Sequence, residues 1–149
     1  MHLQPLVVTS QDVKPLHGLG TEVRFLCEAQ STNNAWSLME LVVPQNSGPP
    51  PHNHDWDEDY YITEGAVEFT VGQEQFTATA GDFAYTPAGL VHGFRGASAQ
   101  PSRMLILDVP AHAGAFFRLV GREVKDLPLD LSRVIDIGKK SGIHFVQPA

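Results

Sequence analysis

A chain of 149 residues with 42% hydrophobic and 18% charged residues suits one globular domain with a buried core. Its formal net charge of −7 at pH 7 argues against a nucleic-acid backbone or an anionic membrane as partner. No stretch approaches the roughly 20 apolar residues of a membrane-spanning helix, and the N-terminus lacks a signal-peptide pattern, so we expect a cytoplasmic protein. Cys27 is alone, which excludes an internal disulfide and favours a buried structural thiol.

The first third of the chain is predicted to form strands. Residues 6–9 are a short apolar run that predicts an edge strand, and residues 12–20, with their proline and glycines, predict a loop. Two further strands are predicted over 22–30 and 35–43, separated by a polar turn. Both faces of 35–43 are largely apolar, which predicts a strand covered on both sides, with Glu40 facing water or a polar cavity.

Candidate metal ligands are concentrated in residues 48–65. His52 and His54 lie two positions apart, so on an extended backbone both imidazoles point to the same face, and the prolines just before them exclude a helix. A fully extended chain would carry Glu58 roughly 13 Å past His54, so Glu58 meets the histidines only if residues 55–57 turn the chain back. Two imidazoles and a carboxylate suit a borderline divalent metal.

Short strands with tight turns are predicted to continue after this stretch, which is typical of an all-β barrel or sandwich. They fall at 66–71, 75–80, within 81–86, from 92 onwards and over 103–109. Two helices are predicted next, over 111–122 with Gly121 as the stop and from 129 or 130 to 140, followed by an extended tail.

Two stretches of the chain resemble the paired motifs of the cupin superfamily. The first motif, a glycine, H-x-H, a spacer, Glu, a second spacer and Gly, is met by His52, His54, Glu58 and Gly65. The second, G-x5-P-x-G-x2-H-x3-N, is met by Gly81, Pro87, Gly89 and His92. The chain departs from the family twice: the leading glycine falls at Asn46, and the closing asparagine is Gly96. Neither position binds metal in the family, so the ligand assignment is unaffected.

The resemblance implies a single cupin (double-stranded β-helix, jelly-roll) barrel spanning the whole chain, 1–149. We expect the barrel core at about 22–110, a helical extension at about 111–149, and a homodimer to which the strand at 6–9 contributes. It also implies one divalent transition metal (Fe, Mn, Ni, Co, Cu or Zn), bound by His52, His54, Glu58 and His92. Such a ligand set leaves coordination positions open for a substrate.

The helix with a Phe-Phe pair and the closing Gly-Ile-x-x-x-x-Pro resemble small bacterial cupins of the quercetin-dioxygenase-like group. This implies a metal-dependent dioxygenase acting on a small aromatic or enol-type substrate, with Glu58 as both ligand and proton acceptor. Phe94, Tyr60 and Trp36 are the expected substrate contacts. The alternatives are a non-catalytic cupin that binds a small molecule, and a metal-dependent isomerase or lyase.

The remaining aromatic and histidine residues receive weaker predictions. Trp56 and Tyr61 are candidates for the mouth of the pocket or for ordinary packing. The other histidines have no partner at ligand spacing, and we expect them to lie at the surface or in hydrogen bonds. These are His2, His17, His112 and His144.

Overall fold

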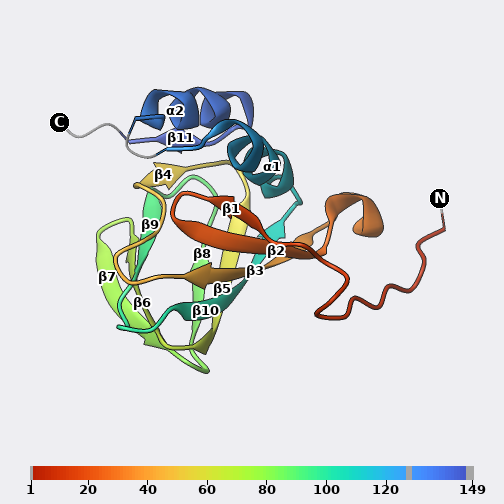
Figure 1. The fold of residues 1–149 in the computed structure, drawn as a ribbon, viewed down its shortest axis with the longest axis horizontal. Helices are drawn as coiled ribbons and strands as arrows, with labels where there is room; N and C mark the ends of the chain where they lie inside the picture. Colours follow the sequence, from red (N-terminus) through yellow and green to blue (C-terminus); the bar gives the residue numbers. More distant parts are fainter. Residues whose placement is uncertain (1, 127–128, 147–149) are drawn as a thin grey trace.

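Two antiparallel sheets face each other and form a barrel in the computed structural model, which describes residues 2–126 and 129–146 (Figure 1). The first sheet contains, in spatial order, β1 (Leu16–Gly18), β2 (Thr21–Cys27), β3 (Ser37–Val43), β10 (Ser102–Val109), β5 (Asp57–Glu64) and β8 (Phe83–Thr86). The second contains β11 (His144–Phe145), β4 (His52–Asn53), β9 (His92–Gly96), β6 (Ala66–Val71) and β7 (Glu74–Thr79). The predicted all-β barrel is confirmed.

The core fills the space between the two sheets and follows the period-2 pattern of the strands. In β3, Met39, Leu41 and Val43 are fully buried, whereas the alternate positions are only half-buried. Trp36, which shares the parity of those outer positions, is 39% exposed. Glu40, also on the outer face, pairs with Arg24 through a 3.0 Å contact rather than facing open water.

Two helices close one end of the barrel. α1 (Ala113–Glu123) and α2 (Leu131–Lys140) lie, together with β11, across the end at which β4 is found (Figure 1). A second apolar cluster joins them to the barrel; it contains Leu19, Trp56, Phe116, Val120, Val134, Ile137 and Ile143. The helix predicted to stop at Gly121 continues to Glu123, because Gly121 does not adopt the positive φ of a helix stop and the Val124 N–H still donates to the Val120 carbonyl at 2.9 Å. Neither described helix is long and apolar enough to cross a membrane.

A buried carboxylate anchors α1 to the barrel. Asp108, near the end of β10, accepts hydrogen bonds from the backbone N–H groups of His112 at 2.7 Å and Ala113 at 2.9 Å. It also accepts one from the hydroxyl of Ser37 on β3. These two amides lie at the start of α1 and have no partner within the helix, so Asp108 caps the helix from the barrel side.

The first 30 residues differ from the sequence-based prediction in three ways. Residues 6–9 form no strand with any described part of the chain, and Val7 is 86% exposed on an arm that extends away from the barrel (Figure 1). Their pairing with a second subunit stays a prediction. Within the predicted loop, β1 pairs with β2 through a hairpin whose turn residues Leu19 and Gly20 have positive φ. Strand β2 ends at Cys27 and is followed by a 3-10 helix, η1 (Ala29–Thr32), where the strand was predicted to continue. The thiol of Cys27 is half-buried rather than buried.

Candidate metal centre

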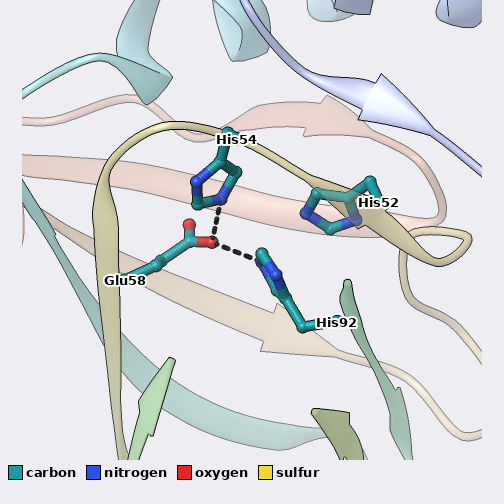
Figure 2. A group of neighbouring side chains, drawn as sticks. All are labelled: His52, His54, Glu58 and His92. Carbon is teal, nitrogen blue, oxygen red and sulfur yellow. Dashed lines mark hydrogen bonds and ion pairs between the residues drawn. The ribbon is translucent and has the colours of Figure 1, made fainter. Parts of the chain in front are cut away.

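Four buried side chains converge at the closed end of the barrel (Figure 2). His52 lies on β4, which pairs with β9 so that His52 stands directly opposite His92. After His54 the chain bends at Asp55 and Trp56 and returns as β5, which brings Glu58 back to the histidines. This is the reversal that the sequence predicts. The donor atoms of the four residues lie within 4.8 Å of one another.

Backbone carbonyls fix the orientation of all three imidazoles. The Nδ1 atoms of His52, His54 and His92 lie 2.8, 2.9 and 2.9 Å from the carbonyl oxygens of Pro50, Trp56 and Leu90. A carbonyl oxygen only accepts, so each Nδ1 carries a proton and donates it. In this orientation Nε2 of each ring points to the centre, and a neutral ring offers its lone pair there, which is the arrangement that metal-binding histidines use.

Glu58 supplies the negative charge of the cluster through one oxygen. Its Oε2 lies 3.0 Å from Nε2 of His54 and 3.1 Å from Nε2 of His92, and it accepts a 2.9 Å hydrogen bond from the Tyr60 hydroxyl. A carboxylate oxygen and an unprotonated Nε2 are both acceptors, so a proton or a cation has to lie between them at these distances. A divalent ion would satisfy all of these atoms at once.

The electrostatics of the cluster favour the forms that bind a metal. Burial opposes ionisation of Glu58, yet the hydrogen bonds with His54 and His92 outweigh it and hold the pKa of the carboxyl well below its usual range. Burial, with a smaller effect of His92, lowers the pKa of His52 to about 4, so this ring is neutral at pH 7. Burial and the Glu58 charge raise the pKa of Tyr60 well above its usual value, so the phenol remains a donor.

The donor set fits a divalent transition metal. Three neutral imidazoles and one carboxylate are ligands for Fe, Mn, Co, Ni, Cu or Zn, and such ions form bonds of about 2.0–2.2 Å with them. Donors bound at that length lie roughly 3–4 Å apart. The four donors already lie close to this spacing, so small side-chain movements complete the shell.

A small cavity of about 30 Å³ lies beside the cluster, next to His52, His54 and Glu58. Most of its wall is apolar and includes Leu41, Phe94, Ile106, Phe116, Phe117 and Phe145. No lysine or arginine is among the described residues that line it. The indole of Trp56 also forms part of the wall, and its Nε1 is buried without a hydrogen-bond partner among the described residues.

The structure brings together two of the three residues expected to contact substrate. Phe94, which shares the parity of His92, lies in the cavity wall as predicted, and Tyr60 lies there as the hydrogen-bond donor to Glu58. Trp36 is not at this site: it lines a separate depression with Leu6 and Val8 of the N-terminal arm. The prediction failed because both faces of β3 are apolar, so alternation alone does not show which face is the inner one.

The structure also shows where Trp56 and Tyr61 lie, for which the sequence left two alternatives, and it adds phenylalanines that were not predicted to lie at the site. Trp56 stacks on the ring of His54, with centroids 4.0 Å apart, and on His112 at 5.0 Å, so it is buried rather than at a pocket mouth. Tyr61 points to the outside of the barrel and is exposed. Phe116, Phe117 and Phe145 come from the C-terminal segments. The Phe-Phe pair was the one local signal for them.

Comparison with known proteins agrees with this description. Residues 38–110 match the cupin domain family. The polyketide cyclase RemF from Streptomyces resistomycificus is 25% identical over 71% of this chain and 80% of its own, with a TM-score of 0.62. A predicted oxalate decarboxylase from Thermotoga maritima is 21% identical over 70% and 99% of the two chains, with a TM-score of 0.66.

A further structural match leads to the same fold. An RmlC-like cupin from Shewanella frigidimarina is 18% identical over 74% of this chain and 96% of its own, with a TM-score of 0.64. No curated protein sequence matches this chain significantly. Residues 38–110 therefore match a cupin domain, the fold is a jelly-roll barrel, and the sequence match and the fold together support the cupin superfamily.

Proposed function

We propose that this protein is a metal-dependent cupin dioxygenase that acts on a small, uncharged enol or phenol. One observation carries the proposal: three Nε2 atoms and the Glu58 carboxylate converge beside an apolar cavity. Four protein ligands leave one or two positions open on a five- or six-coordinate ion, which is what distinguishes a working metal from a structural one.

The chain's own residues supply binding, orientation and proton transfer. His52, His54, Glu58 and His92 would hold the ion, which when bound polarises a substrate oxygen and supports oxygen chemistry. Among the described residues, Glu58 makes its hydrogen bonds through Oε2, which leaves Oε1 as the acceptor for the proton of a substrate hydroxyl. The apolar wall keeps water away from the reacting group.

The charge of the cavity narrows the substrate class. Carboxylate and phosphate groups are usually held by arginine or lysine, and neither residue lines this cavity among the described residues. A divalent ion together with the Glu58 carboxylate would leave one positive charge, which the single negative charge of an enolate or phenolate balances. A neutral molecule that loses one proton when it binds therefore needs no lysine or arginine.

The first experiment measures the metal content of protein purified without chelators. We expect near-stoichiometric Fe, Mn, Ni, Co, Cu or Zn in the wild type and its loss in His52→Ala. His17→Ala, which changes a histidine outside the cluster, is the matched control and should keep its metal. A wild type that holds no metal, even after reconstitution, overturns the proposal.

Turnover is then tested by oxygen uptake with flavonols, diketones and catechols. Glu58→Gln should abolish uptake while retaining much of the metal, because the amide is still a ligand but no longer accepts a proton. Unaltered turnover in this variant refutes the catalytic role of Glu58. Binding of these compounds without oxygen uptake would instead identify a small-molecule-binding cupin.

A second candidate is non-oxidative chemistry on the same kind of substrate. An open divalent site next to a carboxylate also stabilises an enolate, and RemF, which this chain resembles, is described as a polyketide cyclase. The two candidates differ in their need for oxygen. Product formation under anaerobic conditions supports isomerase, lyase or cyclase chemistry, and an absolute requirement for oxygen supports the dioxygenase.

A further inference from the structure

We propose that Phe145, carried by the C-terminal strand β11, limits the size of the molecule that can bind the metal, so that the site accepts small aliphatic oxygen chelators and rejects aromatic ones. The inference rests on the proposed metal centre and deepens it. It names a specificity-determining residue and restricts the proposed enols and phenols to small aliphatic enols, including the enol forms of diketones. Of the three compound classes in the oxygen-uptake test, only the diketones should then react.

The C-terminal tail is built into the metal-binding end of the barrel. β11 pairs with β4, and the register sets Phe145 opposite His52 and His144 opposite Asn53. The backbone N–H of Val146 extends the contact with a 2.9 Å hydrogen bond to the carbonyl of Pro51. Figure 2 shows this strand passing beside His52. A residue near the end of the chain therefore lies next to a proposed ligand.

The ring of Phe145 forms part of the wall beside the cluster. Its centroid lies 5.6 Å from that of His52 and 6.0 Å from that of Phe116 on α1. Both phenylalanines line the cavity, whose volume is about 30 Å³. Engineered apolar cavities that bind benzene measure on the order of 150 Å³, so this cavity has no room for an aromatic ring while Phe145 stays in place.

Helix α2 prevents the ring from swinging away. A side chain at Gly138 would place its Cβ 2.7 Å from Cε2 of Phe145, so the ring packs directly on the helix backbone. The N–H of Ile143 donates to the carbonyl of Gly138 at 2.8 Å, and Gly142, with a φ of +77°, reverses the chain between the helix and β11. The position of Phe145 is thus fixed from both sides.

The test compares two chelators that share one metal-binding group. Acetohydroxamate and benzohydroxamate differ only in carrying a methyl or a phenyl substituent, and their binding is followed by the visible spectrum of cobalt-reconstituted protein. We expect the wild type to bind acetohydroxamate at least about tenfold more tightly than benzohydroxamate. In Phe145→Ala the affinity for benzohydroxamate should rise about tenfold or more, with little change for acetohydroxamate.

Two variants serve as controls. Phe76→Ala removes an exposed phenylalanine of β7 that does not line the cavity, and it should leave both affinities unchanged. Phe145→Leu leaves a larger side chain than alanine in place of the ring and should shift the preference in the same direction by a smaller factor. It keeps the test decisive if Phe145→Ala fails to fold.

The outcomes separate this inference from the proposed function. Failure of the wild type to bind cobalt overturns the metal centre itself. Stoichiometric cobalt with the same chelator preference in wild type and both Phe145 variants leaves the metal centre intact and refutes the role of Phe145. Equal affinity of the wild type for the two chelators also refutes it.

Discussion

Removing the Asp108 carboxylate should destabilise the protein by about 3 kcal/mol. Asp108 is fully buried and accepts hydrogen bonds from two amides at the start of α1 and from the hydroxyl of Ser37. In Asp108→Ala all three donors lose their acceptor. Because α1 carries part of the wall beside the metal cluster, the same change loosens the cover of the proposed site.

The magnitude follows from how well each donor is buried. The amide of Ala113 and the hydroxyl of Ser37 are buried, and each costs about 1–3 kcal/mol when left without a partner. The amide of His112 can be hydrated because that residue is exposed, so it adds little. The two buried groups give about 2–6 kcal/mol, and release of a carboxylate from the interior offsets part of this sum.

Urea unfolding of the metal-free protein, followed by far-ultraviolet circular dichroism, measures the loss of stability. Asp82→Ala is the matched control: Asp82 also accepts an amide hydrogen bond, from Thr79 at 2.8 Å, but in an exposed turn. We expect it to cost about 1 kcal/mol or less. The reasoning is refuted if Asp108→Ala costs no more than Asp82→Ala.

Three further predictions concern the cluster and its surroundings. The unfolding free energy of the metal-free protein should fall by up to about 3 kcal/mol between pH 6.5 and 4, because His52 is protonated there in the unfolded chain but, with a pKa of about 4, not in the folded state. The midpoint of urea unfolding should therefore fall with pH in the wild type and change less in His52→Gln. Tyr60→Phe removes a hydrogen bond that stabilises the Glu58 carboxylate, so this carboxylate should be protonated, and the metal lost, at a higher pH than in the wild type. Metal content after dialysis at a series of pH values measures this shift. Gly48→Ala should lower both the melting temperature and the metal content, because its Cβ would clash with the backbone carbonyl oxygen of Phe94 on β9. Gly72→Ala, whose Cβ would have nothing within 4 Å, should retain metal and lose only about 1 kcal/mol of unfolding free energy.

The ligand set could be read from the sequence because its signals are local. The two-residue spacing of His52 and His54 fixes their common face, and only a turn at 55–57 can return Glu58 to them. Both features are present in the structure. His92 came from a second motif, and the pairing of β4 with β9 explains why the two motifs meet.

The cover of the site could not be read in the same way. Phe145 pairs with His52, which lies 93 positions earlier in the chain (145 − 52). A strand of only two residues, such as β11, has no sequence pattern from which so distant a partner could be predicted. Residues 6–9 form no strand with the described chain, and their pairing with a second subunit stays a prediction. Their apolar, β-branched composition favours a strand, but a strand needs a neighbour, and the described chain offers none.

The chain order of the site has a consequence for how the protein is made. All four proposed ligands lie between residues 52 and 92, whereas the segments that cover them, α1, α2 and β11, lie between 113 and 145. Phe145 follows His92 by 53 residues (145 − 92), which ribosomes add in about 3–11 s. During synthesis the ligands therefore leave the ribosome before their cover, and an ion can reach them while that end of the barrel is still open.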